Sequence, residues 1–309
     1  MLIRLSKGSK EFFRMAMRDR HYIIMFIPAL IYFFIFHYLP MIGIVIAFKD
    51  YTVGSKFLTC QWVGLKWFIE FFESPSFFRV VRNTLLLNIY NIIFMFTFTI
   101  FFSIMLNEIR KNTYKKIAQT ISYLPYFIST VIIVGLIINF LSTEAGIVNK
   151  FLNMFGIESI NFMQDSRWFR TIYVGSNVWT YFGFNSIIYI SSMSSINMEI
   201  YDAADVDGAN RIQKIFKITL PSISQTIGIL LILNLGHLFS SGFEKIILMY
   251  NPATYETADV IGSYIYRRGI QGSDFSFSTA VSLIGSTVNY LLIVIFNFLG
   301  RKTFDISLW

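Results

Sequence analysis

Charged residues are scarce in this chain of 309 residues. Asp, Glu, Lys and Arg make up 14% of the sequence, against roughly 25% in an ordinary soluble domain. Six stretches of 25 to 28 residues contain none of the four, namely 22–48, 83–107, 117–143, 171–198, 218–243 and 275–300. A helix that spans a bilayer needs about 20 mainly apolar residues. The sequence therefore excludes a soluble globular enzyme and predicts an all-α, polytopic integral membrane protein with six transmembrane helices.

Cysteine and histidine are also rare. The single cysteine, Cys60, allows neither an internal disulfide nor a Cys-based zinc site, and two of the three histidines lie inside apolar stretches. The chain has no GxxxxGK[ST] loop to hold nucleotide phosphates. It also has no Ser/His/Asp triad or paired carboxylates in a plausible site. We therefore expect a transport subunit rather than an enzyme, with no metal and no cofactor of its own.

Basic residues exceed acidic ones, giving a net charge of +8. The sequence contains no basic cluster interleaved with aromatic residues, which is the pattern that would indicate a nucleic-acid partner. Lys and Arg instead mark cytoplasmic segments of membrane proteins. If the N-terminus lies inside, the cytoplasmic segments hold 15 Lys and Arg in 58 positions, and the outer segments 11 in 92. The charges predict cytoplasmic termini, with a segment 1–21, one membrane domain 22–300 and a tail 301–309.

The most patterned cytoplasmic segment is 199–221. Acidic residues favour a short helix over 199–206, because they lie near its positive N-terminal end. Gly208 can adopt the left-handed conformation that closes a helix, and Asn210 can cap a second one. Pro221 would lie in the first turn of the fifth span. Such an element suits docking in a groove of another protein. A merely solvated loop would not explain this spacing.

Several positions in this segment resemble the EAA loop of ABC-importer permeases. In that family the loop forms a coupling helix that fits a cleft in the ATPase subunit. Asp202 stands where the family usually has Glu, and Asn197 where a proline is common. The resemblance assigns ATPase coupling to ten residues: Glu199, Asp202, Ala203, Ala204, Asp207, Gly208, Ala209, Phe216, Leu220 and Pro221.

Other segments resemble sugar-uptake permeases of the same family. They are YLP at 38–40, FKDY at 48–51, GLKWF at 64–68, NT at 83–84, LP at 124–125, GIVN at 146–149, and Trp179 with GF at 183–184. The segments YNPATYETADV at 250–260 and YIYR at 264–267, with the C-terminal SLW, are similar to the subgroup associated with oligosaccharides. That subgroup includes polygalacturonan- and rhamnogalacturonan-type permeases.

The resemblance implies the type I ABC-importer permease fold in the cell membrane of a bacterium. It also implies partners: a second homologous permease subunit in a heterodimer, two ATP-binding subunits and an extracytoplasmic sugar-binding protein or lipoprotein. Membrane lipid would surround the spans. ATP and Mg²⁺ would be bound by the partner ATPase. The chain itself would be the subunit through which an oligosaccharide crosses the membrane.

Polar side chains within the spans are candidates for the substrate path, because they usually face the interior of a bundle. The candidates are Asn177, Trp179, Tyr181, Asn185, Asn234, His237, Asn289 and Tyr290. Asn177, Tyr181 and Asn185 recur every four positions and so share one helix face. Each candidate also has a structural alternative, since Asn bonds between helices and Trp and Tyr gather at membrane interfaces.

Three other functions are compatible with parts of the sequence. An ABC permease for a peptide, an amino acid or a polyamine would have the same coupling loop. An ion-coupled secondary transporter would be expected to carry carboxylates within its spans, and these stretches have none. A membrane scaffold or sensor would not need the coupling loop. The outer and C-terminal resemblances favour the sugar importer.

Overall fold

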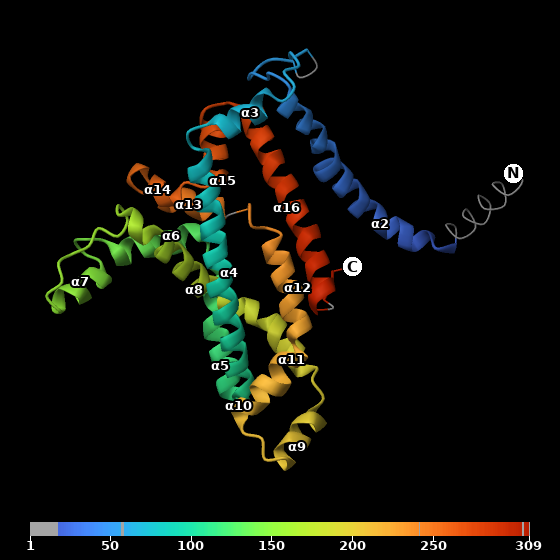
Figure 1. Cartoon of the computed structure of the whole chain (residues 1–309), viewed down its shortest axis with the longest axis vertical. Coiled ribbons are helices and arrows are strands. Elements are labelled where there is room, and N and C mark those ends of the chain that lie inside the picture. The colour runs from blue at the N-terminus through green and yellow to red at the C-terminus, as the bar shows by residue number, and fades with distance from the viewer. Residues whose placement is uncertain (1–17, 57–58, 241, 305, 309) are drawn as a thin grey trace, which may run out of the picture.

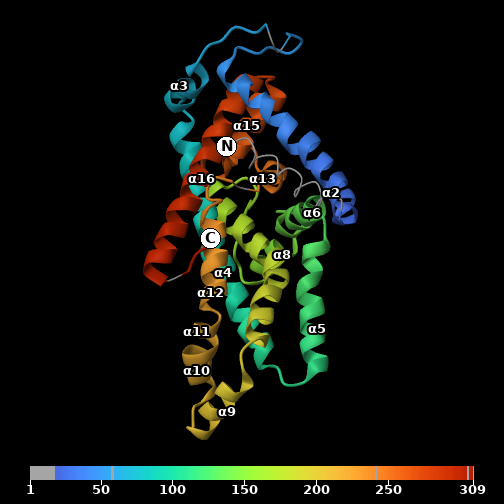
Figure 2. The same ribbon diagram turned by 90° about the vertical axis from the view of Figure 1, so that its right-hand side faces the viewer.

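The computed structural model describes residues 18–56, 59–240, 242–304 and 306–308. Every element of these residues is helical, apart from one isolated bridge between Lys49 and Trp62. The molecule is elongated, with α3 (Lys66–Glu73) and α15 (Ile261–Ile265) toward one end and α9 (Met198–Val206) at the other (Figures 1 and 2). The prediction of an all-α protein is confirmed for these residues.

The first apolar stretch forms a continuous helical segment over Arg20–Phe48. It consists of α2 (Arg20–Phe33), a π-helical turn and a 3-10 helix (Leu39–Phe48). Pro40, which lacks the N–H that an α-helix uses, lies in the first turn of the 3-10 part. In Figure 1 α2 leans away from the other helices, and none of its residues is buried.

The core of the molecule is the pair formed by α4 (Phe77–Glu108) and α8 (Ser166–Ser194), which pack along each other. Leu87 of α4 and Val174 of α8 belong to one buried cluster. The side chain of Asp165 caps α8 by accepting a hydrogen bond from the Arg167 amide. Beside this pair, α12 (Ser224–Leu235) packs on α16 (Phe275–Phe304).

The stretch 117–143 is not the single helix that the sequence predicts. It contains most of α5 (Asn112–Tyr123), a 3-10 turn beginning at Leu124, and α6 (Thr130–Leu141), which is turned by 98°. Pro125 lies in the 3-10 turn. Ser129 is extended and caps α6 by accepting from the Ile132 amide, so a new helix starts in a new direction.

The stretch 218–243 also departs from one helix. A helical segment over Arg211–Ser222, made of α10 (Arg211–Lys214), a π-helical turn and α11 (Leu220–Ser222), bends by 59° into α12. Pro221 therefore lies just before this bend, not at the start of a straight span. Helix α12 ends at Leu235, not at Phe243, because Gly236 caps it, and α13 (Phe243–Met249) follows.

The number of spans depends on how these bent pairs are counted. Within the described residues, three continuous helices are long and apolar enough to cross a membrane, and up to five if each bent pair is one span. Helix α8 has the length, with 29 residues, but its many Asn, Ser and Thr side chains make it less apolar than α4 and α16. The six-span count and the cytoplasmic termini remain predictions.

The segments that the sequence predicts to lie outside the membrane fold into short helices. Helix α7 (Ile147–Met154) follows α6, and α14 (Tyr255–Ala258) lies between α13 and α15. The carboxylate of Asp259 is fully buried and accepts hydrogen bonds from Arg79 of α4 and from Arg267. This cluster fastens the segment after α13 to the N-terminal end of α4.

Candidate coupling and transport sites

The predicted helix–glycine–helix element is present in 199–221. The Asn197 side chain begins α9 by accepting from the Glu199 amide. Gly208 has a φ of +73°, a conformation that glycine adopts without a steric penalty. The side chain of Asn210 accepts from the Gln213 amide, and the Gln213 side chain accepts from the Asn210 amide, so α10 starts with a capping box. Asn197, which replaces the family's common proline, thus serves as a helix cap.

Side chains fasten the two helices of this element together. The Lys214 ammonium lies 2.7 Å from the Asp205 carboxylate. The hydroxyls of Tyr201 and Thr219 lie 2.8 Å apart. These contacts join α9 to the helical segment that continues into α12.

Exposed apolar side chains gather on this element, and we call them the apolar tip: Met198, Ile200, Val206, Ile212 and Phe216. Val206 is 88% exposed. The element lies at the end of the molecule farthest from α3 and α15 (Figures 1 and 2). Clustered exposed apolar side chains mark interaction surfaces. Of the five, only Phe216 is among the coupling residues expected from the sequence.

A polar cavity of about 280 Å³ lies between α4, α8, α12 and α13. Four of the eight path candidates line it, namely Asn177, Tyr181, Asn234 and His237. The side chain of Asn177 makes hydrogen bonds with two other residues of this lining. Its Nδ2 donates to Oδ1 of Asn91 at 3.3 Å, and its Oδ1 accepts from Nζ of Lys245 at 2.8 Å.

The other four candidates lie outside the lining of this cavity. Asn289 of α16 accepts from the Phe239 amide and donates to the Ser240 hydroxyl, so it holds the turn at the cavity's edge. Tyr290 is exposed and Asn185 half-buried. Trp179 lines a separate groove.

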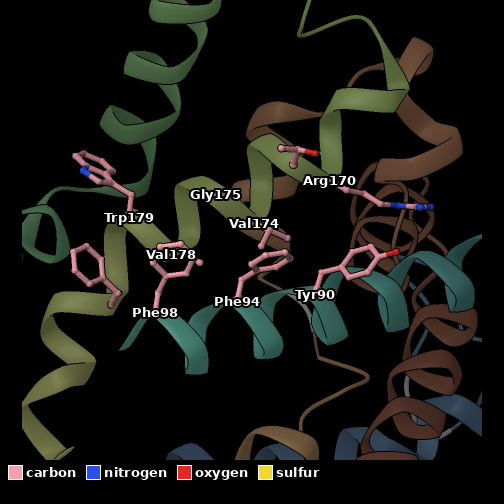
Figure 3. Close-up of a pocket in the computed structure, with 10 residues that line it drawn as sticks. Tyr90, Phe94, Phe98, Arg170, Val174, Gly175, Val178 and Trp179 are labelled. Atoms are coloured by element: carbon pink, nitrogen blue, oxygen red, sulfur yellow. The ribbon is translucent and has the colours of Figure 1, made fainter. Parts of the chain in front are cut away.

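The groove that Trp179 lines is apolar, has a volume of about 690 Å³ and runs between α4 and α8 (Figure 3). Tyr90, Phe94 and Phe98 of α4 face α8 across it, and Arg170 lies toward one end. Its apolar lining offers few hydrogen-bonding groups for sugar hydroxyls, so the polar cavity is the better candidate for a sugar path.

The lining residues that the sequence analysis did not identify include Asn88, Asn91 and Lys245. The two asparagines lie within the charge-free stretch 83–107, so their polarity in a span was a signal that could have identified them. Lys245 fell in the expected outer loop. Lys245 lies beside Asn177 only because α13 folds back toward α8.

Residues 95–304 match the family model described as "Binding-protein-dependent transport system inner membrane component". The chain belongs to this family. It is a bacterial membrane permease and not an enzyme, as the sequence predicts.

Individual relatives agree over nearly the whole chain. The polygalacturonan/rhamnogalacturonan transport system permease protein YteP of Bacillus subtilis (strain 168) is 38% identical over 285 residues, covering 92% of this chain and 89% of YteP. A solved bacterial ABC transporter "involved in the import of the acidic polysaccharide alginate" contains a chain with 41% identity and a TM-score of 0.89, covering 95% of this permease and 99% of that chain.

A second solved structure shows the bacterial alginate ABC transporter in complex with an alginate pentasaccharide-bound periplasmic protein. Its matching chain has 41% identity and a TM-score of 0.89, and the match covers 96% of this permease and 99% of that chain. The family and these relatives confirm that this chain is an ABC-importer permease that works with a binding protein.

Proposed function

We propose that this permease carries an oligosaccharide across the membrane in an ATP-driven importer. The observation that supports this most directly is the 41% identity, over nearly the whole chain, to a chain of an alginate importer. The name of YteP also refers to polysaccharides. Permeases for peptides, amino acids or polyamines, and ion-coupled transporters, are not favoured by these relatives.

The apolar tip and the ten coupling residues would dock on the partner ATPase, which binds ATP and Mg²⁺. Closure of the ATPases on ATP would move α9 and, through Lys214 and Thr219, the helices that follow. The polar cavity would then switch from inward to outward access, and hydrolysis would reset it. In this arrangement 199–221 is the cytoplasmic loop of a membrane domain 22–300, flanked by cytoplasmic segments 1–21 and 301–309.

The remaining partners would cover other surfaces. A second homologous permease subunit would complete a heterodimer, and the unburied α2 offers it an apolar helix. An extracytoplasmic sugar-binding protein or lipoprotein would deliver the substrate at the end that carries α3 and α15. Two ATPase subunits and membrane lipid would complete the assembly.

Coupling is tested with Gly208→Pro and Asp202→Lys. Both variants should insert normally but uncouple uptake from ATP hydrolysis, because the docking element is distorted or its charge reversed. Matched controls lie in the outer segment: Gly156→Pro, at another glycine with positive φ (+75°), and Glu144→Lys, at an exposed carboxylate. Uptake at the wild-type rate in either coupling variant would contradict the assignment.

The substrate class is tested by measuring which members of an oligosaccharide panel bind the partner binding protein and enter vesicles that contain the reconstituted importer. We expect ATP-dependent uptake of at least one oligosaccharide. Uptake without ATP would contradict an ABC importer. Uptake of peptides or amino acids alone would contradict the sugar assignment.

A further inference from the structure

Lys245 of α13 is a buried cation at the wall of the polar cavity. Its side chain belongs to a residue that is 7% exposed and lines the cavity. Burial of a charge is costly unless an opposite charge or several hydrogen bonds compensate for it. The charged and hydrogen-bonding groups around Lys245 therefore indicate which kind of ligand the cavity binds.

Within the described residues, none of the ion pairs includes Lys245. Glu244 lines the same cavity, but it is exposed and makes no ion pair with Lys245. Nζ donates one hydrogen bond, to Oδ1 of Asn177, and lies 5.9 Å from the centre of the Tyr173 ring. An ammonium group has three N–H donors, so donors beyond the one used for Asn177 remain for a ligand.

The groups around Lys245 fix its position and suit a sugar. Asn177 holds Nζ through Oδ1 and is itself held by Asn91. Tyr181 and His237 add an aromatic hydroxyl and an imidazole to the lining. The volume of about 280 Å³ is near the lower end of small-molecule pockets, roughly 300–1,000 Å³. It is therefore suited to one part of an oligosaccharide at a time.

We propose that Lys245 binds the carboxylate of a uronate unit, so that this cavity selects acidic oligosaccharides over neutral ones. The inference rests on the proposed function and adds the charge of the substrate to it. The uronate carboxylate accepts hydrogen bonds from Nζ, and its negative charge compensates for the buried ammonium. A neutral sugar leaves the charge uncompensated. Asn177 is a positioning residue that holds the ammonium toward the cavity.

The test combines a change in the protein with the matching change in the ligand. Binding of trigalacturonate, and of the neutral trisaccharide made by reducing its carboxylates, is measured on the purified complete complex without the binding protein. The variants are Lys245→Gln, Lys245→Arg and, as a control, Lys150→Gln, which alters an exposed lysine of α7. ATPase activity and yield of the complex report on assembly.

Lys245→Gln should weaken trigalacturonate binding by about tenfold or more, as expected for a hydrogen bond to a charged group. It should leave binding of the neutral trisaccharide unchanged. Lys245→Arg should retain most of the preference for the acid, and Lys150→Gln all of it. Equal loss for both ligands, equal binding of both to the wild type, or no saturable binding of either to the wild type would overturn the proposal.

Failure of this proposal is distinguishable from failure of the proposed function. If the wild-type importer takes up oligosaccharides but Lys245→Gln does not alter the acid-to-neutral ratio, only the role of Lys245 is wrong. If the wild-type importer takes up no oligosaccharide, the proposed function itself is wrong.

Discussion

At the scale of single residues, Asp259 connects the outer segment to the core. Its Oδ2 accepts from Nη2 of Arg79 at 3.1 Å and from Nη2 of Arg267 at 2.8 Å, and its Oδ1 accepts from the Ser263 hydroxyl at 2.9 Å. Asn83 donates to the Asp259 backbone carbonyl. Because the carboxylate is fully buried, it is the counter-ion for two partly buried guanidinium groups.

We expect Asp259→Asn to lower the free energy of unfolding by about 2–3 kcal/mol, because it leaves two partly buried cations without their counter-ion. The midpoint of thermal unfolding in detergent measures this loss. Asp165→Asn is the matched control. It removes a charge from a solvent-accessible pair with Arg167 while keeping a helix-capping side chain, so the midpoint should change little. Similar midpoints for both variants would contradict the role of Asp259.

At the scale of elements, the crossing of α5 and α8 depends on Gly183. A Cβ at this position would overlap the backbone carbonyl of Ser122 in α5. Backbone atoms cannot move aside as a flexible side chain can. The missing side chain therefore lets the two helices approach closely.

Gly183→Ala should destabilise the protein by about 1–3 kcal/mol, because it forces α5 away from α8. Gly175→Ala, about two turns earlier on α8, adds a Cβ that meets nothing within 4 Å. This control should be neutral or slightly stabilising, since alanine is the better helix former. Thermal unfolding of the two purified variants distinguishes them. Equal stability would show that the α5–α8 contact does not require a glycine.

The apolar tip belongs to the same scale, since α9, α10 and the π-helical turn after α10 build it together. Val206→Asp should abolish co-purification of the ATPase with this permease and leave folding intact, because the charge is desolvated only when the partner docks. Met154→Asp, on an outer helix and 83% exposed, is the matched control and should not affect ATPase binding. A complex of normal composition with Val206→Asp would contradict the docking role of this surface.

At the scale of the whole molecule, α2 contacts little of its own chain. Its apolar side chains face outward all along the helix, and the following 3-10 helix rather than α2 packs on α16. A photo-reactive benzoylphenylalanine at Phe26 or Phe33 should therefore cross-link to the second permease subunit in the assembled importer. The same group at the buried Phe277 should give no such product. Lipid adducts alone from α2 would contradict the predicted subunit contact.

Local patterns in the sequence were sufficient for part of this architecture. Charge-free stretches predicted the apolar helices, and the acidic residues of 199–206 with Gly208 and Asn210 predicted the helix–glycine–helix element. Both signals act within a few residues: helix periodicity sets the apolar face, and a cap bonds an amide two or three positions away. Polarity within the charge-free stretches also identified four residues that line the polar cavity, out of eight path candidates.

The sequence by itself thus determined that this chain is helical, membrane-embedded and equipped with a helix–glycine–helix element. Only the tertiary structure decided where the helices bend and which distant residues meet. Lys245 reaches Asn177 across 68 positions, and Asp259 reaches Arg79 across 180. Such pairs depend on how helices pack, and packing is set by the shapes of all contacting side chains together. No short segment carries that information.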